Sequence, residues 1–146
     1  MATTLQDIER YGRQQGWWYD EAHQPYGEAL RELGLAETDE VFIFFAHAED
    51  GPTFHSARGE MYHWGWFMLH SDDVKLSMIR MRELGIDGEY IPLDNFAGDG
   101  GHFYNRRTGQ VLYLQAGELL QQYLAGQVQP QWETFAAYLG SYFQLD

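Results

Sequence analysis

The pattern of apolar and polar residues along the chain predicts two short helices at its start. Thr4, followed three residues later by Asp7, is typical of a helix start, and Gly16 suits the end of a helix over "LQDIERYGRQQ". A second helix is predicted over "PYGEALRELG", residues 25–34. It opens with proline, which suits the first helical turn, and closes with glycine, which suits the position after the last turn.

The next apolar stretch, Val41–Ala46, fits two kinds of element. Its unbroken run of apolar residues is typical of a buried strand. Thr38, followed by Asp39 and Glu40, is instead typical of a helix start with acidic residues in the first turn. The acidic start favours the helix, although periodicity alone leaves the strand open.

The middle of the chain has the character of a sheet followed by a helix. Strands are predicted over residues 53–69, because "EMYHWGWFML" is rich in aromatic residues. Gly65 interrupts this stretch, as a β-bulge or a close approach of another backbone segment would require. Residues 71–73 can cap a following helix over "VKLSMIRMREL", which Gly85 ends.

The second half of the chain returns to strands and then to helices. We predict a short edge strand over residues 88–93, a hairpin over residues 102–114, and helices over residues 116–126 and 130–145. This order of elements predicts an α+β fold. Since no tract of Pro, Gly or Ser marks a linker, residues 1–146 are expected to form a single domain.

The composition of the chain excludes some classes of binding partner. The 22 acidic residues exceed the nine basic ones, which gives a formal net charge of -13. Such a chain repels polyanions, so we expect neither nucleic acid nor an anionic membrane as a partner, whereas a basic protein would be attracted. Solubility alone is an equally good interpretation of this charge. The absence of cysteine and of any long apolar run predicts a cytoplasmic protein.

The glycine cluster at residues 98–101 invites three interpretations: a phosphate cradle, a metal site or a turn. A phosphate loop leads into a helix, but here a strand is predicted to follow. Asp94, Asn95 and Asp99 do not supply the alternating oxygen ligands of a calcium loop. We therefore expect these glycines to adopt positive φ and turn the chain, with Asp99 bonding nearby amides.

No catalytic constellation stands out. The six histidines form no HxH or HExxH pattern, and His63 and His70 are expected on opposite faces of a strand. Glu60 and Asp99 would serve glycoside hydrolysis only at a separation that a sequence does not fix. No serine lies in a GxSxG elbow. We expect a protein that is not an enzyme, with no cofactor and no bound metal.

Three segments, in their order along the chain, resemble the SUKH superfamily, the Smi/Knr-type domain that is widespread in bacteria. They are "VFIFFAHAEDG" (residues 41–51), "YIPLDNFAGDGGHFYNRRTGQVLYL" (residues 90–114) and "WETFAAYLGSYF" (residues 132–143). The resemblance covers roughly residues 28–143. It is lost in the Trp-rich "GWWYDEAHQPYG", residues 16–27.

The resemblance implies a curved antiparallel sheet of about five or six strands backed by N- and C-terminal helices, with residues 41–48 helical. It also implies an immunity protein, a class that neutralises secreted or contact-dependent toxins by binding them. We therefore expect a binder of a basic protein toxin, in an oligomeric state that the sequence leaves open. The partner-binding residues expected from acidic and aromatic character are Glu60, Trp64, Trp66, Asp72, Asp94 and Asp99.

Two other functions remain open. The first is a regulatory scaffold or small-ligand-sensing domain that uses a concave sheet face. The aromatic residues expected to line that face are Tyr62, Trp64, Trp66, Phe103 and Tyr113. The second is a sugar hydrolase that uses the pair Glu60 and Asp99.

Overall fold

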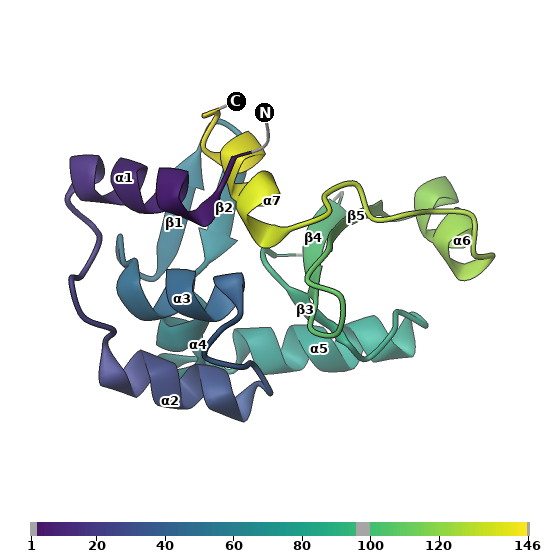
Figure 1. The fold of residues 1–146 in the computed structure, drawn as a ribbon. Helices are drawn as coiled ribbons and strands as arrows, with labels where there is room; N and C mark the ends of the chain where they lie inside the picture. The colour runs from purple at the N-terminus through teal and green to yellow at the C-terminus, as the bar shows by residue number, and fades with distance from the viewer. Residues whose placement is uncertain (1–2, 96–99, 146) are drawn as a thin grey trace.

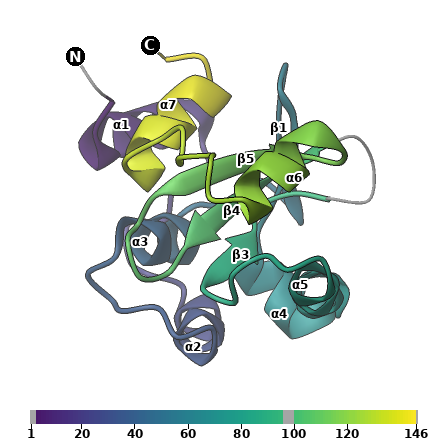
Figure 2. The ribbon, with the colours of Figure 1, turned by 90° about the vertical axis from the view of Figure 1, so that its right-hand side faces the viewer.

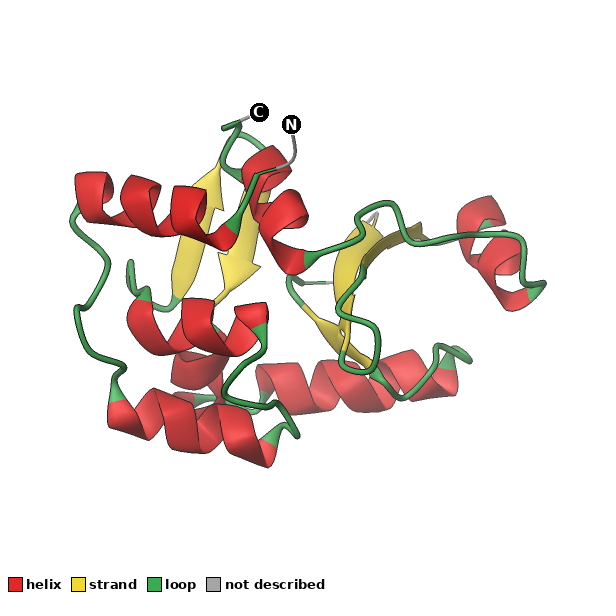
Figure 3. Ribbon diagram, viewed as in Figure 1, coloured by secondary structure: helices red, strands yellow, loops and turns green. Residues whose placement is uncertain are grey.

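The computed structural model describes residues 3–95 and 100–145, and these residues form an α+β fold (Figures 1 and 3). The helices are α1 (Leu5–Gln15), α2 (Gln24–Glu32), α3 (Glu40–His47), α4 (Trp64–His70), α5 (Asp73–Glu83), α6 (Glu118–Leu124) and α7 (Phe135–Tyr142). The strands are β1 (Thr53–Ser56), β2 (Gly59–Tyr62), β3 (Tyr90–Pro92), β4 (Gly100–Asn105) and β5 (Val111–Gln115). None of these helices combines the length and the apolar character that crossing a membrane requires.

The strands form two small antiparallel sheets in place of the single sheet of five or six strands that was expected. β1 pairs with β2, and β3, β4 and β5 pair in that order. Two helices, α4 and α5, lie between β2 and β3 in the chain, so the first hairpin does not continue into the second sheet. The sheets meet where the amide of Tyr62 donates to the carbonyl of Leu93 at 2.7 Å.

Two clusters of buried apolar side chains hold the fold together. The larger cluster is centred on α3, where Val41, Phe44 and Phe45 are fully buried. The smaller one lies between α5, α6 and one face of the β3–β4–β5 sheet, as Figure 2 shows with α6 in front of the sheet and α5 below it. Successive residues of a strand face opposite sides, so Phe103 enters the smaller cluster while Tyr104 enters the larger one.

The first half confirms several predicted elements. Thr4 and Asp7 form a capping box: Thr4 Oγ1 accepts from the Asp7 amide at 3.3 Å, and Asp7 Oδ2 accepts from the Thr4 amide at 2.9 Å. Gly16 ends α1 with φ of 80°. The ambiguous stretch after Thr38 is the helix α3, as the acidic first turn indicated.

The strand predicted up to Leu69 is wrong beyond Tyr62, where the chain forms α4. His63 is the reason, because its ring Nδ1 accepts a hydrogen bond from the Trp66 amide at 3.0 Å and so caps the helix. A histidine cap has no simple sequence signal, whereas the aromatic content strongly favoured a strand. His63 and His70 consequently stand at the two ends of a helix, not on opposite faces of a strand.

Gly65 permits a close approach, one of the two roles proposed for it, but the approach is between helices. A Cβ atom at this position would lie 2.7 Å from ring atoms of Tyr26, which belongs to α2. Only a residue without a side chain therefore allows α2 and α4 to pack at this distance.

Gly65→Ala is expected to lower the free energy of unfolding by about 2 kcal/mol, because the added methyl group overpacks the α2–α4 contact. Gly27→Ala is the matched control, since a Cβ at that helical position would lie 3.6 Å from Phe42, an ordinary contact. It should be neutral or slightly stabilising, because alanine favours helix. Urea unfolding measures both, and equal effects of the two variants would contradict this packing.

The last helix begins later than expected. Pro130 does not open it, because the backbone of Trp132 pairs with Val111 through hydrogen bonds of 2.9 and 3.2 Å and keeps this segment extended. Thr134 is the actual cap, since its hydroxyl accepts from the Ala137 amide at 3.0 Å. The extended segment covers part of the outer edge of β5.

The turn expected at Gly100 and Gly101 is wrong. Both glycines belong to β4, where they pair with Gln115 and Leu114, and neither has a positive φ. Gly98 and Asp99 lie outside the described residues. The predicted hairpin is confirmed, with its own turn ending at Gly109, where φ is 77°.

Candidate partner-binding site

The two tryptophans expected to bind a partner differ in exposure. Trp64 is fully buried, and its indole Nε1 donates to the carbonyl of Pro92 at 2.8 Å. It is therefore part of the core and is not available to a partner. Trp66 is half-buried on α4, where its ring packs against Phe67 and His70.

The expected acidic residues occupy separate elements. Asp72 is exposed at the start of α5, Glu60 is exposed on β2, and Asp94 is half-buried after β3. Asp99 lies outside the described residues. Burial is the main cause that raises the pKa of the Tyr62 phenol, and the negative charges of Asp73, Asp94 and Glu60 add to it.

The five aromatic residues expected to line one concave sheet face do not do so. Trp64 lies in the larger cluster and Phe103 in the smaller one, and Trp66 is on a helix. The ligand pocket proposed for that face is therefore absent among the described residues. The errors at Trp64 and Trp66 come from the helix that begins after His63, whereas Phe103 lies on a strand but faces the smaller cluster.

A site that sequence reasoning missed is centred on Glu49, which follows α3. The hydroxyl of Tyr19 donates to Glu49 Oε1 at 2.5 Å, and the hydroxyl of Tyr26 donates to Oε2. Two backbone hydrogen bonds bring the segments together: the Tyr19 amide donates to the His47 carbonyl at 2.7 Å, and the Glu49 amide to the Trp17 carbonyl at 2.8 Å. We call Tyr19, His23, Tyr26 and Glu49 the Glu49 site.

The hydrogen bonds keep Glu49 ionised. Partial burial by itself would raise its pKa, but the hydroxyls of Tyr19 and Tyr26, together with nearby His63 and His23, outweigh burial and hold the pKa below its usual value. The pKa of each tyrosine is raised, for Tyr19 mainly by its hydrogen bond to Glu49 and for Tyr26 mainly by burial. The site therefore presents an oriented negative charge.

Tyr19→Phe is expected to raise the pKa of Glu49, because one of the two hydroxyls that stabilise the carboxylate is removed. Tyr19 is 43% exposed, so the substitution should leave the core intact. Carbon-detected NMR titration of the Glu49 carboxyl measures the change. Tyr11→Phe is the control, and an unchanged Glu49 pKa in Tyr19→Phe would contradict the hydrogen bond.

His63 forms the buried support of the site. Its ring lies 4.5 Å from that of Tyr26, and its Nε2 donates to the Ala48 carbonyl at 2.7 Å. Burial lowers the pKa of His63 to about 4, so the ring is neutral at pH 7. With both nitrogens engaged, His63 fixes Tyr26 and the backbone before Glu49, and it has no nitrogen left for a ligand.

The rim of the Glu49 site is acidic and aromatic. Glu21 and Asp50 are exposed, and neither forms an ion pair with any residue that the structure describes. Asp20 is held by Arg13 at 2.5 Å. The ring of His23 stacks on Tyr19 with 5.9 Å between centroids. This arrangement suits a cationic group, which a carboxylate and aromatic faces both attract.

The sequence did contain a signal for this site. Residues 16–27, the segment in which the SUKH resemblance is lost, supply Tyr19, His23 and Tyr26. The aromatic and acidic residues of this segment were the available signal, but Glu49 lies 30 positions from Tyr19, and a sequence does not pair residues across such a distance.

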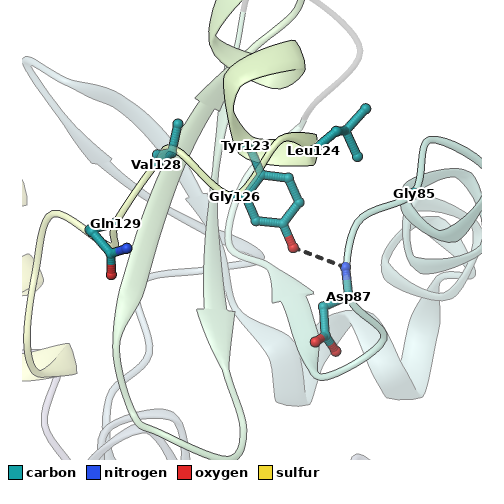
Figure 4. A pocket seen from close by; sticks show the side chains of 7 residues that line it. All are labelled: Gly85, Asp87, Tyr123, Leu124, Gly126, Val128 and Gln129. Carbon is teal, nitrogen blue, oxygen red and sulfur yellow. Dashed lines mark hydrogen bonds between the residues drawn. The ribbon is translucent and has the colours of Figure 1, made fainter.

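A hollow of about 500 Å³ lies between α6 and the turn after α5, lined by Gly85, Asp87, Tyr123, Leu124, Gly126, Val128 and Gln129 (Figure 4). Tyr123 accepts a hydrogen bond from the Asp87 amide at 3.1 Å, and Asp87 itself bonds the Glu89 amide at 2.9 Å. In residues 3–95 and 100–145, no three His, Asp or Glu side chains are placed to hold a metal ion.

Comparisons with protein-family models, with curated proteins and with solved structures found no match to the chain. These comparisons therefore assign no function to the chain.

Proposed function

We propose that the chain is a non-enzymatic binding domain for a basic protein, and that it acts as an immunity protein against a toxin in the cytoplasm. The observation that carries the proposal is the Glu49 carboxylate, which two tyrosine hydroxyls orient at an acidic, aromatic rim. The SUKH resemblance supports the toxin as partner, because many members of that superfamily are immunity proteins.

An arginine or lysine of the partner fits this site best. Each oxygen of Glu49 accepts one tyrosine hydroxyl, and a carboxylate oxygen has a second acceptor position for the partner's cation. A guanidinium group can also lie flat on the ring of Tyr19, which is 43% exposed. The net charge of -13 attracts a basic partner over longer distances and would speed its association.

Glu49→Gln is expected to weaken binding about tenfold, because it removes the charge while keeping the size of the side chain. Isothermal titration with a basic toxin domain, chosen from those that bind the wild-type chain, measures the dissociation constant at low and high salt. Wild-type affinity should fall as salt is raised, since the attraction is screened.

Glu118→Gln is the matched control for this measurement. Glu118 is exposed on α6, which lies far from α2 and α3 in Figure 1. Glu118→Gln makes the same change in net charge as Glu49→Gln and should alter the dissociation constant less than twofold. If both variants weakened binding equally, the change in net charge alone would explain the effect, and a site at Glu49 would be contradicted. An affinity that is indifferent to salt would contradict the basic partner.

A further inference from the structure

We infer that a hollow beside His102 binds a small planar aromatic acid, whose anionic group contacts Arg58 while its ring lies against Tyr113 and Trp132. The hollow has a volume of about 400 Å³, and its lining residues are Arg58, His102, Tyr113, Gln131 and Trp132. It shares no residue with the Glu49 site, so this inference is independent of the proposed function.

Asp94 fixes the imidazole of His102 in one orientation. Asp94 Oδ2 lies 2.7 Å from His102 Nδ1, and Asp94 Oδ1 accepts the His102 amide at 2.9 Å. The carboxylate accepts the proton on Nδ1, which leaves Nε2 as the nitrogen available to a ligand. No residue in the described part of the chain hydrogen-bonds to Nε2.

Aromatic rings surround this imidazole on three sides. The ring centroids of Tyr113, Tyr138 and Trp132 lie 5.0, 5.2 and 5.6 Å from that of His102. Trp132 and Tyr138 pack edge to face, 5.2 Å apart, which holds the tryptophan in place. A planar ligand ring can stack on such walls.

Neighbouring residues hold Tyr113, one wall of the hollow, in place. A Cβ atom on Gly100 would lie 2.5 Å from the Tyr113 hydroxyl oxygen, so the phenol lies across a position that only glycine leaves free. The Gln131 side chain holds the backbone of Tyr113 from the other side, accepting from its amide at 2.8 Å and donating to its carbonyl at 3.3 Å. The wall is therefore formed before any ligand arrives.

The charged and titratable groups around His102 favour an anionic ligand group. They are Arg58 from the β1–β2 turn, Asp94, Tyr113 from β5 and Tyr138 from α7. Asp94 is already engaged with His102, whereas Arg58 takes part in none of the ion pairs among the described residues. The positive charge left over is thus that of Arg58. A carboxylate would accept hydrogen bonds from its guanidinium group.

Titration with 2-naphthoate, followed by NMR and calorimetry, tests this inference. We expect a dissociation constant of about a millimolar, in keeping with a ligand of this size. The indole N–H signal of Trp132, assigned with Trp132→Phe, should shift on binding. The neutral analogue 2-naphthamide and the non-aromatic acid cyclohexanecarboxylate should each bind at least fivefold more weakly, because one lacks the charge and the other lacks the planar ring.

Variants separate the site from non-specific binding. Arg58→Gln changes an exposed side chain and should weaken 2-naphthoate at least fivefold without lowering the melting temperature. Glu49→Gln should leave 2-naphthoate binding unchanged. Equal binding of 2-naphthoate and 2-naphthamide, or unchanged affinity in Arg58→Gln, would overturn the inference.

Discussion

Acidification from pH 7 to pH 4 is expected to remove about 3 kcal/mol of the free energy of unfolding through His63 alone. Burial lowers its pKa in the folded protein to about 4, against 6.5 for an unperturbed histidine. Between these values the unfolded chain binds a proton that the folded chain does not, so protons favour unfolding. The stabilisation is complete above pH 6.5 and is lost as the pH falls towards 4.

Urea unfolding at several pH values measures this loss. His63→Gln, which keeps a donor and an acceptor but does not titrate, should flatten the curve between pH 6.5 and 4. His55→Gln, an exposed position on β1, should keep the wild-type slope. Glu49 affects the free energy of unfolding at lower pH than His63 does. Because its pKa is lowered in the folded protein, its stabilising contribution is lost only below about pH 4.5. A wild-type slope in His63→Gln would contradict the neutral, buried histidine.

Trp64→Ala is expected to lower the free energy of unfolding by about 4 kcal/mol. The side chain is fully buried, packs 4.9 Å from Phe45 and edge to face with Tyr104, and donates a hydrogen bond to Pro92. Truncation removes the packing, creates a cavity and leaves the Pro92 carbonyl unpaired.

The half-buried neighbour on the same helix provides the control for this substitution. Trp66→Ala should cost less than half as much as Trp64→Ala in the same urea unfolding measurement, because part of its ring is already in contact with water. Similar costs for the two variants would contradict the burial of Trp64. So would a Trp64→Ala protein that keeps its stability and loses only binding to a partner.

The elements that sequence reasoning predicted correctly are those with local signals. The Thr4–Asp7 capping box and the acidic start of α3 each lie within a few residues of the helix they begin. The hairpin of β4 and β5 likewise has its turn residues between two alternating segments. Such signals act over one helical turn or one loop, and no distant contact competes with them.

The elements that were missed depend on contacts between distant residues. α4 begins directly after His63, because the ring that caps the helix is held in the core by the Ala48 carbonyl, 15 positions earlier. α7 begins late because Trp132 pairs with Val111. Intrinsic propensity favoured a strand where α4 forms and an earlier start for α7. Tertiary contacts overrode the propensity at both places.

The sequence suggested a class of partner but not the place where it would bind. The acidic charge and the aromatic residues led to the expectation of a basic protein partner, which stays a prediction. The choice of Trp64 was wrong because an aromatic residue gives no sequence signal that separates burial from exposure. Glu49 could not be singled out among 22 acidic residues, because its partners Tyr19 and Tyr26 approach it only in the folded chain.

Amide hydrogen exchange, measured with and without the basic partner, tests the central claim most directly. If a cationic group of the partner docks on Glu49, protection should appear in residues 17–23 and 48–51, the segments that form the site and its rim. Protection confined to α5 and α6, with these segments unchanged, would show that the partner binds elsewhere and would contradict the account.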